Sequence, residues 1–133
     1  MSAERRIEAF LTLAERGLVS ATRLLRAGQL EDAALFLQQV VERVARALLT
    51  DSGVAFGTSH NIGQMAEALP ETHPLRDRIR QFDHLSSAVT AFRYPTSSGR
   101  LQHAPAAGKL REGLAEAERL LIDAKAHVLT AET

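Results

Sequence analysis

The amino-acid sequence predicts an all-α fold, an antiparallel up-and-down bundle of four long helices with one short connecting helix. Apolar residues recur three or four positions apart over long segments, which is the spacing of one helical face. Turn-forming residues separate these segments, and the shortest link is Gly28-Gln29, which leaves little besides an antiparallel hairpin. A chain of 133 residues has room for one core, so we expect a single domain over residues 1–133.

The first two helices carry the clearest helical pattern. We expect the first over residues 2–27, ended by Gly28, and the second over residues 30–50, ended by the turn-forming residues 51–53. Their apolar stripes consist of Ile7, Phe10, Leu11, Ala14, Leu18, Ala21 and Leu25 in the first helix and Leu30, Ala33, Leu37, Val40, Val41, Val44 and Leu48 in the second.

The middle of the chain predicts a short helix and a long one. Residues 61–69 form the connecting helix, which Pro70 closes. A long helix then runs from Pro74 to about residue 93, because Pro74 suits a first helical position and Pro95 disfavours helix at the residue before it. Its apolar stripe is Leu75, Ile79, Phe82, Leu85, Val89 and Phe92.

The last helix is expected over residues 105–131. Gly113 lies beside its apolar stripe and costs about 1 kcal/mol of helix propensity relative to Ala, so we expect another helix to approach closely there. The stripe consists of Leu110, Leu114, Ala117, Leu121, Ala124 and Val128, and it suits either core packing or dimerisation.

Composition excludes several classes of function. Sixteen basic and sixteen acidic side chains balance, so any nucleic-acid partner must be held by a local patch rather than by net charge. Without Cys there is no disulfide framework and no thiolate chemistry. The charged start and the lack of a long apolar run predict a cytoplasmic protein without a signal peptide or membrane contact. The sequence also lacks the common metal, cofactor and nucleophile motifs, so we expect neither metal nor cofactor.

A polar seam runs along the second predicted helix beside its apolar stripe. It consists of Gln39, Glu42, Arg43 and Arg46. One interpretation is a solvated face in which Glu42 and Arg46 form an i,i+4 ion pair worth a few tenths of a kcal/mol. The other is a working surface, in which Arg43 and Arg46 bind an anion.

The segment 93–105 is the longest stretch without periodicity, and loops of this length in small bundles are often functional. It contains Arg93, Tyr94, Arg100 and His103. Two guanidinium groups, a phenol and an imidazole can bind a phosphodiester and move protons near neutral pH. The alternative is a loop whose Arg side chains cap helix-end carbonyls and whose His is merely exposed.

His60 is a third candidate, because it stands where the short connecting helix begins. An imidazole there either contacts a ligand or satisfies nearby backbone groups. The sequence leaves both interpretations open.

Three stretches together are similar to a known family: residues 36–49 (FLQQVVERVARALL), residues 56–62 (FGTSHNI) and residues 92–95 (FRYP). In order and spacing they resemble the HEPN family, the higher eukaryotes and prokaryotes nucleotide-binding domain. The likeness in helix layout extends over nearly the whole chain.

The resemblance implies a prokaryotic helical-bundle protein, often a homodimer, that binds nucleotide or RNA. Such proteins are commonly one half of a two-gene module of the toxin–antitoxin type, with a minimal nucleotidyltransferase as the partner. Many members are metal-independent endoribonucleases with an active site assembled across the dimer.

The family's nuclease motif places a His a few residues after an Arg, and this chain departs from that spacing. Arg93 precedes His103 by ten positions and Arg100 precedes it by three, so the motif is not matched. Arg93 does fall at the corresponding helix exit, and the resemblance implies that Glu42 is its ion-pair partner. Inside a bundle such a pair must be well hydrogen-bonded.

Three hypotheses follow. In the first, the chain binds nucleotide or RNA phosphate through the segment 93–105 and the polar edge of the second helix, where the resemblance also places Gln39 and Arg46. In the second, the same loop is an endoribonuclease, with His103 or His60 as the acid/base and Arg93 or Arg100 stabilising the phosphorane. In the third, the bundle is a non-catalytic dimerisation or interaction module.

Overall fold

A computed structural model describes residues 2–88 and 95–131 of the chain. Its regular elements are all helical, and this part of the chain contains no strand. The elements are α1 (Ala3–Arg26), α2 (Leu30–Asp51), α3 (Ile62–Ala68), α4 (Arg76–Arg80), the 3₁₀ turn η1 (Asp83–Leu85) and α6 (Ala107–Ala131).

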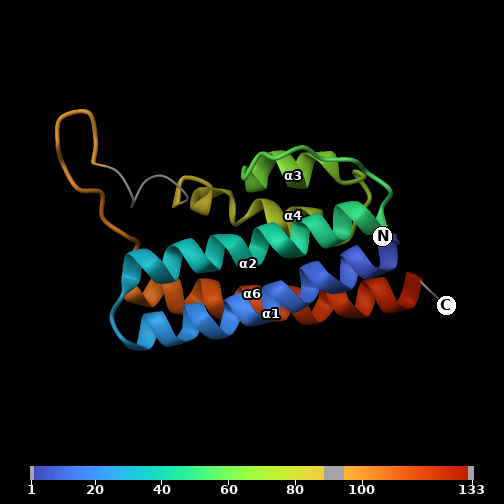
Figure 1. Cartoon of the computed structure of the whole chain (residues 1–133), viewed down its shortest axis with the longest axis horizontal. Coiled ribbons are helices and arrows are strands. Elements are labelled where there is room, and N and C mark those ends of the chain that lie inside the picture. Colours follow the sequence, from blue (N-terminus) through green and yellow to red (C-terminus); the bar gives the residue numbers. More distant parts are fainter. Residues whose placement is uncertain (1, 89–94, 132–133) are drawn as a thin grey trace.

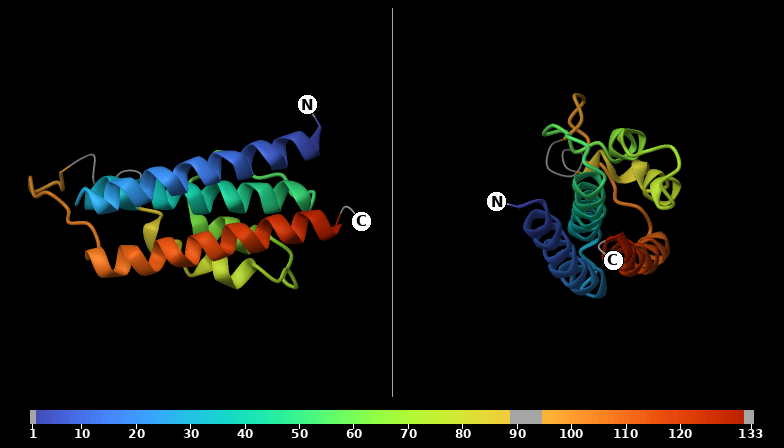
Figure 2. Two further views of the ribbon diagram at one scale, coloured as in Figure 1. Left: turned by 90° about the horizontal axis from the view of Figure 1, so that it is seen from below. Right: turned by 90° about the vertical axis from the view of Figure 1, so that its right-hand side faces the viewer.

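Three long helices form the body of the molecule. Figure 1 shows α1 running in one direction and α2 and α6 running in the other, and Figure 2 shows the three helices packed around one another. The segment of α4 and η1 runs back along α2, so the chain alternates in direction as an up-and-down bundle does. None of the described helices is apolar over a length that would cross a membrane.

The hairpin of α1 and α2 is fixed by its local sequence. Ser2 caps α1 by accepting a hydrogen bond from the Arg5 N–H. At the other end Gly28 adopts φ +76°, and the Gln29 N–H reaches back to the Leu24 carbonyl, which together form a Schellman stop. Gly53 ends α2 in the same way, at φ +72°. Both predicted helix ends are confirmed.

The core is mainly aliphatic, in keeping with the low aromatic content of the sequence (5%). Most of α2 is buried, because α1 covers one of its sides while α6, α3 and η1 cover others. The largest fully buried apolar side chains are Leu37, Leu48, Leu49, Ile62, Met65, Ile79, Leu110, Leu120, Val40, Val41 and Val44.

Two glycines let the long helices approach closely. A Cβ on Gly113 would lie 3.0 Å from Leu37 Cδ2, so the close approach of α6 to α2 that this glycine predicts is confirmed. The tighter contact is between α1 and α2, where a Cβ on Gly17 would lie 2.9 Å from Val40 Cγ2. The contact at Gly17 was not apparent from the sequence.

The prediction of a long helix from Pro74 is wrong over residues 74–88. The chain there forms the five-residue α4 and then η1, and its hydrogen bonds shorten to i→i−3, as in Leu85 N–H to the Phe82 carbonyl. The cause is a tertiary contact: Asp83 Oδ1 accepts from the Gly63 N–H (2.9 Å), and Ser86 Oγ accepts from the Ile62 N–H (2.9 Å). These two side chains cap α3 instead of facing solvent on a regular helix. The predicted helix end near residue 93 lies outside the described residues.

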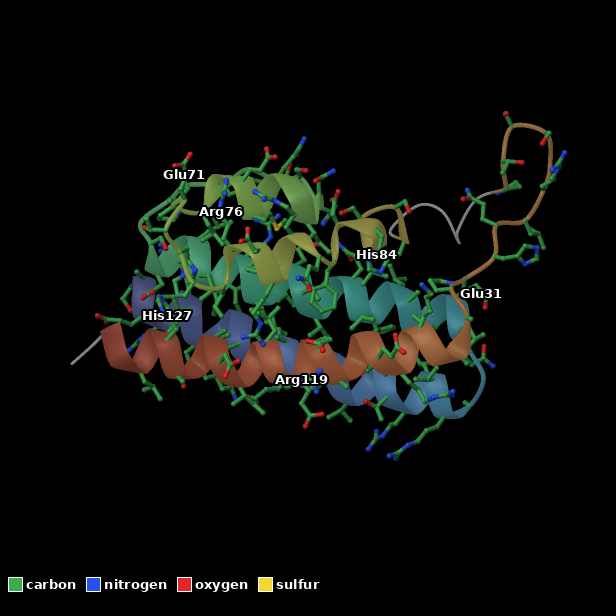
Figure 3. The ribbon with its side chains drawn as sticks, turned by 180° about the vertical axis from the view of Figure 1, so that it is seen from behind. Glu31, Glu71, Arg76, His84, Arg119 and His127 are labelled. Carbon is green, nitrogen blue, oxygen red and sulfur yellow. The ribbon has the colours of Figure 1, made fainter. Side chains whose placement is uncertain are left out.

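A cluster of two histidines and one carboxylate joins three parts of the fold near the carboxyl ends of α2 and α6. The rings of His73 and His127 lie 4.7 Å apart between centroids, and His127 Nε2 lies 3.8 Å from Asp51 Oδ2 (His127 is labelled in Figure 3). His73 Nδ1 accepts from the Leu75 N–H (3.1 Å), while its Nε2 is buried without a hydrogen-bond partner in the described chain. Burial and the neighbouring His127 lower the pKa of His73 below 6.5, although Asp51 acts in the opposite direction.

Filling the space at Gly17 should destabilise the fold. In Gly17→Val the new side chain must displace Val40 in a closely packed core, and overpacking of this kind costs about 1–3 kcal/mol. Urea unfolding followed by circular dichroism measures the loss. Gly108→Val is the matched control, because its nearest neighbour is an Arg111 side-chain nitrogen at 3.8 Å. Equal stability of the Gly17 and Gly108 variants would contradict the close approach of α1 and α2.

The His73 cluster should make the fold sensitive to mild acid. Because the pKa of His73 is lower in the folded state, the unfolded chain binds a proton more readily, so the stability that this group contributes is complete above pH 6.5. That stability is lost as the pH falls from 6.5 through the folded-state pKa. His73→Asn keeps an acceptor for Leu75 but does not titrate, and it should flatten this part of a stability–pH profile. An unchanged slope in His73→Asn would contradict this role of the cluster.

Candidate functional site

Polar side chains on α2 hold the segment 57–60 against the helix. Gln38, Glu42 and Arg46 follow one another at intervals of four residues, so they lie in a row on one side of α2. The segment 53–61 runs back along α2 toward α3 and passes this row (Figure 1). The row therefore determines where the segment lies.

Arg46 binds the segment through backbone oxygens. Its Nη1 donates to the Gly57 carbonyl (3.1 Å), its Nη2 donates to the Ser59 carbonyl (2.9 Å), and its Nε donates to Glu42 Oε2 (3.1 Å). The guanidinium carbon also lies 5.8 Å from the centre of the Phe56 ring, within cation–π range. Each of the three guanidinium nitrogens thus has a partner within the chain.

Glu42 is the acceptor at the centre of the network. Its Oε1 accepts from Gln38 Nε2 (3.0 Å) and lies 2.8 Å from His60 Nδ1, while its Oε2 accepts from Arg46. Burial raises the pKa of this carboxyl, but the hydrogen bonds from His60, Gln38 and Arg46 together outweigh burial, so the pKa lies below 4.5. Glu42 is therefore a carboxylate at neutral pH.

Gln38 is fully buried, and no role was predicted for it from the sequence. Its Nε2 donates to both Glu42 Oε1 and the His60 carbonyl (3.2 Å), which fixes the orientation of the amide. Its Oε1 has no hydrogen-bond partner in the described chain. The signal was present in the sequence, because Gln38 stands three or four residues from Ala34 and Val41 on the apolar face.

His60 is held at both its backbone and its ring. Gln38 binds its carbonyl and Glu42 binds its Nδ1, yet its side chain is 56% exposed. Among the described residues, Nε2 makes no hydrogen bond. His60 therefore stands at the boundary between the buried network and solvent.

The start of α3 keeps His60 in place from the other side. The Asn61 side chain accepts from the Gln64 N–H (2.8 Å), and Asp83 accepts from the Gly63 N–H. A Cβ at position 63 would lie 2.7 Å from the Asp83 carboxylate, so only glycine fits there without displacement. This contact explains the glycine in the sequence HNIG.

The other two seam residues, Gln39 and Arg43, lie on the accessible side of α2. Both are half-buried, and Arg43 lies against α1, with its Nη1 3.8 Å from where a Gly17 Cβ would be. Arg43 makes no hydrogen bond or ion pair with any described residue. The predicted i,i+4 pair of Glu42 and Arg46 is confirmed, but Glu42 is buried, so the prediction of a solvated face is wrong there. Arg43, by contrast, has no ion-pair partner among the described residues.

The candidate loop is described only from residue 95 onward. The Thr96 N–H donates to the Arg100 carbonyl (2.8 Å) and the Arg100 N–H donates to Thr96 Oγ1 (3.0 Å), which form a tight turn with Gly99 at φ +83°. Arg100 and His103 are exposed, and the segment extends beyond the end of the bundle, away from the middle of α2 (Figure 1). The described chain does not bring Arg100 or His103 to His60 or Glu42.

Arg93 and Tyr94 lie outside the described residues. The predicted pairing of Glu42 with Arg93 is therefore a hypothesis still, and the partners of Glu42 within the described chain are Gln38, Arg46 and His60. Over residues 2–88 and 95–131, no group of three His, Asp or Glu side chains is arranged to hold a metal ion.

Fold and site together define a class: a helical-bundle domain in which polar side chains of the central helix fix a connecting segment that carries a histidine. The chain matches the HEPN domain family over residues 7–128, and it belongs to that family. It is also similar in structure to the crystal structure of ST0689, an archaeal HEPN homologue, with a TM-score of 0.69 and 23% identity. That match covers 96% of this chain and 99% of the other. None of the curated proteins matches the chain significantly.

Replacing Arg46 by Lys should loosen the segment 57–60. An ammonium group is a point charge and cannot reach Glu42 and two carbonyls at once, so Arg46→Lys should cost about 1–3 kcal/mol of unfolding free energy. Amide hydrogen exchange should also accelerate in residues 57–64. Arg119→Lys, at an exposed i,i+3 pair with Glu116 on α6, should change the stability little (Figure 3). Similar losses in both variants would show that Arg46 does not hold the segment.

Proposed function

We propose that this HEPN-domain protein binds the phosphate of a nucleotide or of RNA at the accessible edge of α2, with Arg43 as a principal contact. The observation that supports the proposal best is the state of Arg43. It is half-buried and has no counter-charge among the described residues, whereas the neighbouring Arg46 is paired. A partly desolvated guanidinium is stabilised by an anion, and phosphate suits its planar set of donors.

The charges around Arg43 favour a bound anion over a bound cation. Arg46 donates to one Glu42 oxygen, and Gln38 and His60 bind the other. The negative charge of the carboxylate is thus compensated by Arg46 within the protein. His60 adds a polar group next to the same network. We include Arg93 and Tyr94, which lie outside the described residues, in the proposed site because the sequence there resembles that of the family.

Arg100 and His103 enter the proposal as secondary contacts. Both are exposed on the segment 95–106, and neither has a side-chain hydrogen bond or ion pair with another described residue. A long ligand such as RNA can reach this segment from α2, whereas a mononucleotide at Arg43 would not need it. The length of the ligand therefore separates their contributions.

The endoribonuclease alternative has less support in the described chain. It needs a guanidinium and an imidazole near one phosphorus atom, and Arg93 is outside the described residues. His103 has no described carboxylate to orient it. Cleavage of RNA by EDTA-treated protein, leaving a 2′,3′-cyclic phosphate and abolished by His103→Asn, would move this alternative ahead of simple binding.

Family membership also supports two proposals about assembly. One is a homodimer, which light scattering would detect as twice the mass of the chain. The other is a complex with a minimal nucleotidyltransferase encoded next to this protein, which co-purification would detect. Co-purification without any nucleotide or RNA binding would favour the pure interaction module.

Binding should depend on Arg43 and weaken with salt. Fluorescence anisotropy with labelled ATP and a short labelled RNA should show binding at low salt, and Arg43→Gln should weaken it by tenfold or more, because a hydrogen bond to a charged group is worth about 1.5–3 kcal/mol. Arg93→Ala should also weaken it. Each lost phosphate contact should lower the salt dependence of RNA binding by about one unit of slope.

Arg119→Gln is the control for Arg43→Gln, because it makes the same change in charge on α6. It should leave the affinity unchanged. The proposal is contradicted by a wild-type protein that binds neither ligand at low salt, or by equal losses in the Arg43 and Arg119 variants.

A further inference from the structure

The hydrogen bond between Glu42 and His60 determines which nitrogen of the imidazole carries the proton. Nδ1 lies 2.8 Å from Glu42 Oε1, and a carboxylate can only accept. The carboxyl is ionised at neutral pH because its pKa lies below 4.5, where burial acting upward is outweighed by the hydrogen bonds that it accepts. The proton therefore lies on Nδ1, and in the neutral ring Nε2 carries the lone pair.

The same contacts hold the ring in a fixed place. The His60 carbonyl accepts from Gln38, the carbonyls of Gly57 and Ser59 accept from Arg46, and Asn61 caps α3 directly after it. Backbone and ring are thus anchored independently. The His60 ring is therefore already oriented, and a ligand that binds it loses little free energy in ordering the side chain.

The acceptor nitrogen Nε2 belongs to a ring that the described chain leaves largely open to solvent. The His60 side chain is 56% exposed even though Nδ1 is bonded to a buried carboxylate. Nε2 makes no hydrogen bond with any described residue. In its neutral form His60 thus offers a hydrogen-bond acceptor to whatever binds beside α2.

An acceptor lone pair selects a particular ligand group. It repels phosphate oxygen, so the neutral ring is suited to an O–H or N–H donor rather than to the phosphate itself. On a nucleotide bound through its phosphate, the ribose hydroxyls are the nearest O–H donors. For such a ligand Arg43 on α2 would supply the positive charge for the phosphate, and His60, on the segment that Gln38 and Arg46 hold against α2, would supply the acceptor.

We propose that His60 Nε2 accepts a hydrogen bond from a ribose hydroxyl of the bound ligand, and that Glu42, acting through the His60 ring, sets a preference for ribonucleotides over deoxyribonucleotides. This inference rests on the proposed nucleotide binding and adds to it a specificity-determining residue and a positioning residue. His60 touches the ligand, whereas Glu42 acts only through the tautomer that it imposes.

The tautomer can be tested on the ligand-free protein. Nitrogen-15 NMR of the histidine ring, assigned by its loss in His60→Asn, should show that the neutral ring carries its proton on Nδ1 and none on Nε2. A neutral ring with its proton on Nε2 in the wild-type protein would overturn the inference whether or not nucleotides bind.

The preference is tested with ATP and its 2′-deoxy and 3′-deoxy forms in the anisotropy assay. Wild-type protein should bind at least one deoxy form roughly three- to tenfold more weakly, the range for one neutral hydrogen bond. In His60→Asn, which keeps a donor for Glu42 but lacks Nε2, all three ligands should bind alike. Glu42→Gln can donate to Nδ1 and so allows the other tautomer, and it should lose the preference while Arg43 still supports binding. His84→Asn should keep the wild-type pattern.

The outcomes separate this inference from the function on which it rests. If ATP and both deoxy forms bind equally to the wild-type protein, and Arg43→Gln still weakens binding, nucleotide binding stands and the role of His60 is wrong. If no form binds, the proposed function fails and the inference fails with it. Unfolding curves of His60→Asn and Glu42→Gln show whether a lost preference reflects lost folding.

Discussion

The buried carboxylate of Glu42 is the interaction on which the polar part of this bundle depends. An unpaired carboxylate in the side of α2 would be costly, and here three neighbours, Gln38, Arg46 and His60, provide its hydrogen bonds. Two of those neighbours also hold the backbone of the segment 57–60. One ionised group therefore fixes the path of the connection between α2 and α3 and the orientation of the imidazole that begins it.

The rest of the fold supplies the rigid frame for this network. The close contact of α1 and α2 at Gly17 and the contact of α6 with α2 at Gly113 leave α2 almost enclosed, with only a narrow accessible edge. Asp83 and Ser86 cap α3, and the chain that carries them does not form a regular helix. The irregular segment from α4 to η1 therefore helps to fix the start of α3 and the segment that precedes it.

Local pattern was enough to predict most of the fold. The stripes of α1, α2 and α6, the stops at Gly28 and Gly53 and the short helix before Pro70 all depend on contacts between near neighbours in the chain. The segment from Pro74 could not be predicted correctly, because the apolar spacing of Leu75, Ile79, Phe82 and Leu85 is helical. The disruption comes from the contact of Asp83 with Gly63, about twenty residues earlier. The hydrogen bonds that cap α3 outweigh the local preference for helix in this segment.

The polar network on α2 could be predicted from the sequence only where its contacts are local. Glu42 and Arg46 were assigned to one i,i+4 pair, and His60 was singled out, yet the link between His60 and Glu42 spans eighteen residues and needs the fold to appear. The burial of Gln38 comes from the segment 57–60, which covers it, and this contact depends on the tertiary fold. Residues 93 and 94 lie outside the described structure, so their assignment still depends on the sequence.

Arg46 donates hydrogen bonds to the backbone carbonyl oxygens of Gly57 and Ser59, and every amino acid has such an oxygen. Gly57 has no positive φ, and no neighbouring atom lies within 4 Å of the place that a Cβ would take, so a side chain can be added there without steric conflict. Position 57 is thus free to vary in sequence while the course of the segment over α2 remains the same. Within a lineage, the surface beside His60 can acquire new ligand contacts without rebuilding the scaffold that presents them.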